Sequence, residues 1–531
     1  MAISPSQLPE REGWSTKLGV ILAVAGSAVG LGNFLRFPGV AAQNGGGAFM
    51  VPYFVAFLLL GIPICWSEWI MGRYGGRRSG LSSCPGILGY LCRGGVMRYF
   101  GALGLFIPVV IYMYYVYIES WCLAYAWFTV SGQLGRAEVN FAEFFNQYTG
   151  LGSGGGEYFG SVVAAFLFFL VTFFINFALI YRGLSKGIEK FCIWAMPVLV
   201  LCALFIVARV LTLGAPNPAL PDQNVNNGLG FMWNPKWGAL ADADVWLAAC
   251  GQIFFSLSIG FGIIMTYASY LKKKDDVVLS GLTASTMNEF CEVCLGGLIV
   301  LPAAFIFLGM AGTAEAAKST FGLGFVTMPH IFALMPLGRI FGFLFYTLLF
   351  LAGVTSSLSM LQPAIAFLEE GFNLGRRASV TFLALITFMG SCALIFSHGS
   401  DVLGTMDNYA SNLGIPLLAL AQVVIFVFVI GVDRGVREGR LGADMRLPRW
   451  FPFVITYVSP LFLCGILGSW FYQNFLSPSR VEEELSVLEL NTILGMLGLL
   501  ALFFVLVHLA WPRMRQRAML YARQNPEEAQ E

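Results

Sequence analysis

Long apolar runs recur along the whole chain, and they restrict its possible folds more than any other feature. Most of them reach or exceed the roughly 20 residues that an α-helix needs to cross a bilayer. Only 11% of the 531 residues are charged, against about 25% in soluble domains, so a soluble protein of this size would lack polar surface. We therefore predict an all-α membrane protein. The runs give twelve transmembrane helices, near residues 18–42, 48–72, 100–130, 160–180, 188–213, 244–271, 277–311, 339–368, 378–396, 402–430, 451–474 and 488–511.

The few basic residues are unevenly divided between alternate loops. With the N-terminus taken as inside, 24 of the 31 lysines and arginines fall in inside loops, and six lie outside or near outer helix ends. Membrane proteins keep positive charge on the cytoplasmic side, so this division supports both the number of spans and cytoplasmic termini. We expect an integral protein of the plasma (inner) membrane, surrounded by lipid. The net charge of +1 gives no indication of a nucleic-acid partner.

Two predicted spans contain glycines and small polar residues near their middles. They are residues 26–33 (GSAVGLGN) in span one and residues 255–262 (FSLSIGFG) in span six. Glycine disfavours a helix by about 1 kcal/mol relative to alanine, and freed backbone groups at membrane depth need a protein-enclosed or wet cavity. Taken singly, each stretch would more often serve close helix packing. Because they lie five spans apart, we instead predict a five-plus-five inverted repeat with a substrate site at its two broken helices.

This repeat predicts how the chain is divided. None of the outer loops is long enough to form a separate domain. The predicted segments are a cytoplasmic N-terminal segment (1–16), the first repeat with spans one to five (17–213), an outer loop (214–241), the second repeat with spans six to ten (242–431), spans eleven and twelve (449–511), and a cytoplasmic tail (512–531).

Long motifs extend from residue 11 to beyond residue 407. They include REGW (11–14), GSAVGLGNFLRFP (26–38), NGGGAF (44–49), YYVYIESW (114–121), SKGIE (185–189), GQIFF (251–255) and AGVTSS (352–357). These motifs resemble those of the neurotransmitter:sodium symporter family, specifically its bacterial amino-acid transporters. The resemblance implies a LeuT-type fold with helices one and six broken, and a symporter for sodium and an amino acid rather than an enzyme. Spans eleven and twelve match only in general character.

The resemblance implies two sodium sites. Sodium prefers several oxygen ligands, and broken helices supply carbonyls, amides and hydroxyls. The first ion is expected at the Ala28 carbonyl, the Asn33 and Asn288 side chains, Ser256 and the substrate carboxylate, which would couple the two solutes. The second is expected between spans one and eight, at the carbonyls of Gly26, Val29 and Ala352 and the hydroxyls of Thr355 and Ser356.

The same resemblance implies where an amino acid binds. Its carboxylate is expected at Leu31, Gly32 and the Tyr115 hydroxyl, and its ammonium at the carbonyls of Ala28, Phe255 and Ser256 and the Ser258 hydroxyl. Its side chain is expected among Val29, Ile111, Phe255, Phe261, Ser356 and Met360. Since none of these is charged, we expect a neutral, apolar side chain. Gly30 argues against monoamines, because monoamine-carrying relatives have an aspartate there.

Charged residues at membrane depth and near the two mouths are the remaining candidates. Glu292 lies one turn beyond Asn288 on the same face of span seven. Relatives that need chloride have a serine there, so we expect the carboxylate to replace the anion and transport to be chloride-independent. The expected outer gate is Arg36 with Asp407 through water, and the expected inner gate is Arg11 with Glu370, supported by Trp14 and Tyr270.

Two alternatives are left open. A proton-coupled amino-acid transporter would use Glu292 in place of one sodium. An amino-acid sensor would bind without net flux, although only 20 residues follow Trp511 and no signalling domain is apparent in them. The residues do not decide whether the protein forms a homodimer.

Overall fold

The structure of the protein is a computed structural model that describes residues 13–135, 139–150, 158–397, 400–477 and 485–530. All regular secondary structure in these residues is helical. Ten helices are long and apolar enough to cross a membrane. A bent helix pair, Leu18–Ala28 with Gly32–Gln43, makes an eleventh span. The short apolar helix Ala243–Ser256 and the helix that follows it, Ile263–Ser269, lie where the sequence predicts the remaining span, so the described residues are consistent with the predicted twelve.

The first five spans occupy residues 17–211. Labels with η mark π-helical segments, apart from η5, which is a 3₁₀-helix. The elements are α1 (Lys17–Ala28), η2 (Gly32–Arg36) and α2 (Phe37–Gln43) in span one; α3 (Gly47–Ala56), η3 (Phe57–Gly61) and α4 (Ile62–Ser79) in span two; α6 (Met97–Val130) in span three; α8 (Val163–Ile180) in span four; and η4 (Leu184–Glu189) with α9 (Lys190–Leu211) in span five.

The next seven spans complete the bundle. They are α11 (Ala243–Ser256) with α12 (Ile263–Ser269); α13 (Val277–Glu289), η6 (Phe290–Gly297) and α14 (Leu298–Ala317); α17 (Gly338–Met360) with α18 (Gln362–Phe372); α19 (Arg376–Phe396); α20 (Ser400–Asp407), η8 (Asn408–Gly414), α21 (Ile415–Val424), η9 (Ile425–Gly431) and α22 (Val432–Gly439); α23 (Phe451–Phe453), η10 (Val454–Val458), α24 (Ser459–Phe471) and η11 (Tyr472–Leu476); and α26 (Val487–Gln524).

Short helices also form in segments that the hydropathy pattern predicts only as loops or tail. Local capping explains several of them: Asn140 caps α7 by accepting from Glu143 N–H, Asn224 caps α10 by accepting from Asn227 N–H, and Pro85 lies in the first turn of α5. These helices are α5 (Cys84–Leu91), α7 (Phe141–Thr149), α10 (Val225–Trp233), η5 (Trp237–Ala241), α15 (Thr320–Gly322), η7 (Leu323–Thr327), α16 (Met328–Leu334) and α27 (Pro526–Gln530).

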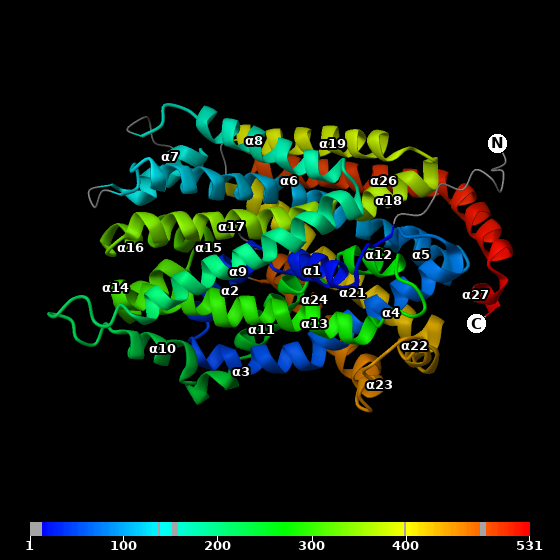
Figure 1. Ribbon diagram of the computed structural model, residues 1–531, viewed down its shortest axis with the longest axis horizontal. Coiled ribbons are helices and arrows are strands. Elements are labelled where there is room, and N and C mark those ends of the chain that lie inside the picture. Colours follow the sequence, from blue (N-terminus) through cyan, green and yellow to red (C-terminus); the bar gives the residue numbers. More distant parts are fainter. Residues whose placement is uncertain (1–12, 136–138, 151–157, 398–399, 478–484, 531) are drawn as a thin grey trace.

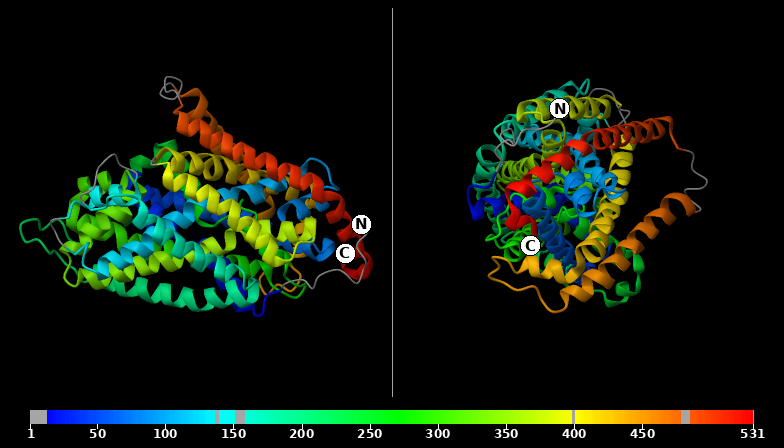
Figure 2. Two further views of the ribbon diagram at one scale, coloured as in Figure 1. Left: turned by 90° about the horizontal axis from the view of Figure 1, so that it is seen from above. Right: turned by 90° about the vertical axis from the view of Figure 1, so that its right-hand side faces the viewer.

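The spans run roughly along the longest axis of the molecule, so the loops gather at its two ends (Figure 1). α5, α22, α23 and α27 lie at one end, on the right of Figure 1, and α7, α10 and α16 lie at the other. The right-hand end holds the arginines in the last turn of α4 and in the loop after α22, and we call it the basic end. α6 is buried along its most apolar stretch, whereas α24 and α26 stand at the outside of the bundle (Figure 2).

Span one is interrupted between α1 and η2. α1 ends at Ala28, Val29 has extended backbone angles, and the two halves of the span meet at 47°. The Gly30 N–H donates to Asn33 Oδ1 at 2.8 Å, and the Leu31 N–H donates to the Tyr115 hydroxyl at 3.0 Å. Side chains thus replace helical carbonyls at this break, as burial in an apolar membrane requires.

Span six is interrupted over residues 257–262. Ser258, Gly260 and Gly262 have positive φ angles of 53°, 78° and 78°, which end α11 and precede α12. The Gly260 N–H donates to Glu68 Oε1 at 3.0 Å. Because Glu68 belongs to α4 and is fully buried, a neighbouring span positions the break. Both interruptions lie where the glycine-rich stretches predict them.

Gly260→Ala should destabilise the fold. A Cβ at this position would lie 2.5 Å from the Ile415 carbonyl oxygen, and alanine is strained at a φ of 78°. We expect a cost of about 1–3 kcal/mol, measured as a lower melting temperature of the purified protein in detergent. Gly465→Ala on α24 is the matched control, because no atom lies within 4 Å of its Cβ position. Equal melting temperatures for the two variants would contradict this description of the turn.

Candidate functional site

A small cavity lies where the two breaks meet α6 and α17. Its volume of about 20 Å³ has room for about one water molecule. Apart from Asn33, a predicted sodium ligand, every lining residue belongs to the predicted substrate set. Of the other predicted residues, Val29 is fully buried and Leu31 lines an outer chamber. The cavity is lined by Ala28, Gly30, Gly32, Asn33, Ile111, Tyr115, Phe255, Ser256, Ser258, Phe261, Ser356 and Met360.

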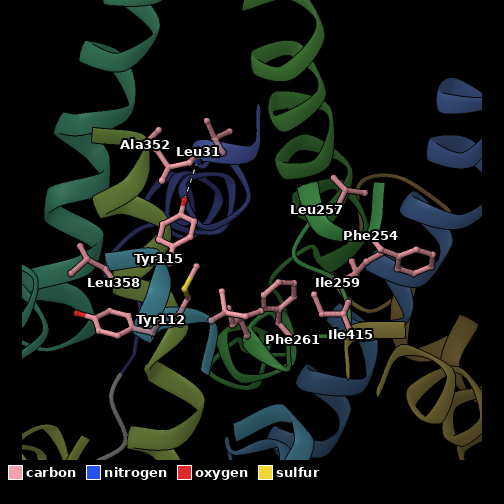
Figure 3. Close-up of a cluster of buried hydrophobic side chains, with 14 of the residues drawn as sticks. Leu31, Tyr112, Tyr115, Phe254, Leu257, Ile259, Phe261, Ala352, Leu358 and Ile415 are labelled. Carbon is pink, nitrogen blue, oxygen red and sulfur yellow. Dashed lines mark hydrogen bonds between the residues drawn. The ribbon is translucent and has the colours of Figure 1, made fainter. Parts of the chain in front are cut away.

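The Tyr115 side chain points to the break of span one (Figure 3). Its hydroxyl accepts the Leu31 N–H, which is drawn as a dashed line. A Cβ at Gly30 would lie 2.6 Å from the Tyr115 hydroxyl and 3.2 Å from Ser356 Oγ, so this close approach requires glycine. The N–H groups at the start of η2 form the positive end of a half-helix. Together with a phenol, this arrangement is suited to a carboxylate.

Two amide side chains connect the broken helix one to span seven. Asn33 Nδ2 donates to Asn288 Oδ1 at 2.8 Å, and Asn288 Nδ2 donates to Ser256 Oγ at 2.7 Å. All three residues are buried. The network therefore brings together Asn33, Ser256 and Asn288, three of the four residues predicted for the first sodium, and the fourth, Ala28, lines the same cavity.

The Glu292 carboxylate lies directly behind these amides. It accepts from Gln252 Nε2 at 2.5 Å, from Asn288 Nδ2 at 3.4 Å, and from the Ser256 hydroxyl. The carboxyl is fully buried, and all three donors are neutral. When ionised, this carboxylate would attract a cation held by Ser256 and Asn288.

The residues predicted for the second sodium lie where α1 contacts α17. A Cβ at Gly26 would lie 3.2 Å from Thr355 Cβ. Ser356 Oγ donates to the Ser27 carbonyl at 2.9 Å, and Thr355 Oγ1 donates to the Ala352 carbonyl at 3.1 Å. A hydroxyl that donates to a carbonyl keeps its lone pairs, so Thr355 and Ser356 retain oxygens that can ligate a cation.

Arg36 and Asp407 line a chamber of about 240 Å³ on the side of the site away from the basic end. The Arg36 guanidinium lies 4.3 Å from the centre of the Phe255 ring. Asp407 Oδ1 accepts the Tyr114 hydroxyl at 2.8 Å. Within the part of the chain that the structure describes, Arg36 and Asp407 make no direct ion pair. Their expected interaction through water stays a prediction.

The expected inner gate is divided between described and undescribed residues. Arg11 lies outside the described residues. Glu370 is buried and accepts from Ser82 N–H at 2.5 Å, from Ser83 N–H at 3.2 Å and from the Ser83 hydroxyl at 2.8 Å. It therefore binds the residues that precede α5.

The two aromatic residues expected at the inner gate have different surroundings. Trp14 Nε1 donates to the Tyr267 carbonyl at 3.2 Å, and the Trp14 ring contacts the Tyr267 ring edge-on with centroids 5.0 Å apart. Tyr270 directly follows α12 and packs, partly buried, against the core. Trp14 thus holds the segment before α1 against α12 at the level of Tyr267.

Comparison with protein families decides what kind of molecule this site belongs to. A model described as the sodium:neurotransmitter symporter family matches residues 11–148 and 139–510. The chain belongs to this family. An uncharacterized sodium-dependent transporter of Methanocaldococcus jannaschii is 32% identical over 471 residues, covering 86% of this chain and 90% of its own. The sodium- and chloride-dependent glycine transporter 2 of Xenopus laevis is 25% identical, covering 87% of this chain and 64% of its own.

A solved structure shares the fold. The crystal structure of MhsT in complex with L-phenylalanine matches with a TM-score of 0.75 and 27% identity, covering 87% of this chain and all of that chain. This symporter therefore has the LeuT-type fold that the resemblance to its family implies. As a member of a family of secondary transporters, it is a sodium-dependent integral membrane transporter and not an enzyme.

Some residues that hold the symporter's site together are not in the predicted set. Gln252 orients Glu292, and the hydroxyls of Ser27 and Ser359 lie 2.6 Å apart between α1 and α17. All three are polar residues in apolar spans, which is itself a signal of a functional or structural role. Gln252 also belongs to the GQIFF motif. The motif therefore indicated a role for Gln252, although the predicted site residues did not include it.

Asn288→Ala should weaken sodium binding, because it removes an amide that contacts Asn33, Ser256 and Glu292. We expect the sodium concentration that gives half-maximal thermal stabilisation to rise about tenfold or more. The measurement is the melting temperature across a sodium titration at constant total salt. Asn217→Ala, in an exposed loop, is the control. An unchanged titration midpoint in Asn288→Ala would contradict the assignment of Asn288 to a sodium site.

Proposed function

We propose that the protein is a symporter that takes up a neutral, apolar amino acid together with sodium by alternating access, without a requirement for chloride. The observation that carries this proposal is the cavity between the two broken helices. It combines the backbone groups of the two breaks, hydroxyls and amides with apolar side chains, and no charged side chain lines it. A zwitterion supplies its own opposite charges, so it needs dipoles at both ends rather than a charged pocket.

Two sodium ions are proposed to accompany the substrate. The first would be held by Ala28, Asn33, Ser256 and Asn288 with the substrate carboxylate, and the second by Gly26, Val29, Ala352, Thr355 and Ser356. The contacts of Asn33 with Asn288 and of α1 with α17 support these two sets. An ion that shares the substrate carboxylate raises substrate affinity, and the substrate raises ion affinity by the same factor.

The side-chain end of the cavity supports an apolar substrate. Ile111, Phe261 and Met360 line it, and all three are buried. MhsT, which has the same fold, is described in complex with L-phenylalanine. Gly30 has no side chain that could supply a carboxylate to a substrate without one, such as a monoamine. The cavity of about 20 Å³ must expand to admit an amino acid, and rotation of Tyr115 and Phe261 would provide the space.

The charge distribution supports an orientation in the membrane. We propose that the basic end faces the cytoplasm of the plasma (inner) membrane and that both termini lie there. The segment 17–213 would then form the first repeat and 242–431 the second, with 214–241 outside. Spans eleven and twelve (449–511) and the tail (512–531) would follow the repeat.

Uptake into liposomes tests the proposal and its alternatives together. An inward sodium gradient should concentrate labelled phenylalanine or leucine, and potassium in place of sodium should abolish this accumulation. Lysine and glutamate should compete poorly, because their charges would lie unpaired in an apolar pocket. Accumulation driven by a pH gradient without sodium would favour proton coupling. Saturable binding without accumulation would favour a sensor.

Chloride replacement tests the proposed role of Glu292. Wild-type uptake should be the same in chloride and in gluconate, because the carboxylate supplies the negative charge behind Ser256 and Asn288. Glu292→Ser should lose about tenfold or more of its uptake in gluconate and regain part of it in chloride. Glu315→Gln, an exposed carboxylate on α14, is the control. Loss of wild-type uptake in gluconate would contradict chloride independence.

A further inference from the structure

The first turn of the broken helix one is held by a single buried carboxylate. Glu189 Oε2 accepts the Ser15 N–H at 3.0 Å, and Oε1 accepts the Thr16 N–H at 3.1 Å and the Thr16 hydroxyl at 3.0 Å. Glu189 is the last residue of η4, directly before α9, and it is only 2% exposed. The carboxylate therefore ties the start of α1 to the start of span five, 173 residues later in the chain.

The partners of this carboxylate are neutral. Among the described residues, no lysine or arginine side chain forms an ion pair with Glu189. The N–H groups at a helix start have no helical acceptor, and a negative charge is favourable at this end of the helix dipole. If α1 moved away, Glu189 would lose these donors, so the contact favours one position of the helix.

The surrounding residues are adapted to this contact. A Cβ at Gly19 would overlap with Glu189 Oε1, so only glycine leaves room for the carboxylate on the side of α1. Glu370, the carboxylate expected at the inner gate, instead binds Ser82 and Ser83. In this structure, Glu189 is therefore the carboxylate that secures α1.

Release of α1 would uncover a defined part of span five. A Cβ at Gly26 would lie 3.4 Å from both Cys192 Sγ and Met196 Sδ, so these sulfur atoms face α1. Cys192 is fully buried and follows Glu189 by one turn of the helix. The same Gly26 belongs to the proposed second sodium site. Movement of α1 away from α9 would thus expose Cys192 and the sodium site together.

We propose that Glu189 is a positioning residue that locks the inner half of helix one against α9, and that release of this contact opens the sodium site toward the basic end. The inference rests on the alternating access that we propose as the function. The proposed contact keeps the inner side of the transporter closed, whichever amino acid is transported.

Cys192 provides a native reporter of this opening. Proteoliposomes are treated with N-ethylmaleimide in sodium or in potassium, and labelling of the Cys192 peptide is followed by mass spectrometry. In the wild type, labelling should be slow in sodium and faster in potassium. Glu189→Ala should label about tenfold faster in sodium, because several charge-assisted hydrogen bonds are lost. Glu189→Gln keeps an acceptor oxygen and should fall between the two, and Glu315→Gln should match the wild type.

A substitution on α1 tests the same contact from the other side. Gly19→Ala should speed up labelling on its own, because the methyl group displaces the carboxylate. Added to Glu189→Ala, it should change the rate less than about twofold, since contacting residues that act through one interaction are not additive. Alanine is otherwise more favourable than glycine within a helix, so Gly19→Ala should not loosen α1 in general. Faster labelling of this variant would therefore come from displacement of the carboxylate. Gly465→Ala is the matched control.

The outcomes distinguish a failure of the lock, which is the contact of Glu189 with Ser15 and Thr16, from a failure of the proposed function. If wild-type labelling is the same in sodium and potassium, alternating access and the lock both fail. If the wild type responds to sodium but the Glu189 and Gly19 variants label at the wild-type rate, only the lock is overturned. If Glu189→Ala does not fold, Thr16→Val takes its place, because Thr16 is exposed and its hydroxyl is one of the three donor groups. It should label about threefold faster, and a wild-type rate would overturn the lock.

Discussion

Backbone groups that have lost their helical partners dominate the organisation of this symporter. Inside a membrane such groups need a partner from the protein, and each break finds its partners on other spans. Leu31 N–H donates to Tyr115 on α6, and Gly260 N–H donates to Glu68 on α4. The Ser27 carbonyl accepts from Ser356 on α17. The two interruptions therefore determine which spans surround the centre of the molecule.

Apart from Glu68, the groups that satisfy the breaks are also ones that we propose for binding. Tyr115 bonds to Leu31 where we propose the substrate carboxylate, and the amides of Asn33 and Asn288 bond to each other where we propose a cation. Solutes can therefore bind by exchanging one set of partners for another, without leaving the backbone unsatisfied. Glu292 differs from these groups because it does not line the cavity and instead bonds to the neutral side chains of Gln252 and Ser256. Its carboxylate lies behind the proposed ligands Ser256 and Asn288.

Sequence patterns predicted the parts of the structure that depend on composition along the chain. The apolar runs gave the spans, and the glycines of residues 26–33 and 255–262 gave the breaks, because both are local properties. Short helices such as α7 and α10 depend on caps that hydropathy does not detect. The partners of Glu189 and Glu370 were not predicted either, since they lie more than 170 residues away in the chain. Motifs marked Glu189 as noteworthy but could not identify its contact.

The half-buried charges of the outer chamber and the buried carboxylate at the start of α1 differ in their access to dissolved ions. Arg36 and Asp407 border an open chamber, where mobile ions of the bath reach them and weaken any attraction between them. The Glu189 carboxylate is buried, and its bonds to the Ser15 and Thr16 N–H groups involve no charged partner. Salt screens the attraction between exposed charges much more than it weakens a buried contact. If the basic end faces the cytoplasm, as proposed, changes in total salt at constant sodium would act on the chamber of Arg36 and Asp407 more than on the Glu189 contact.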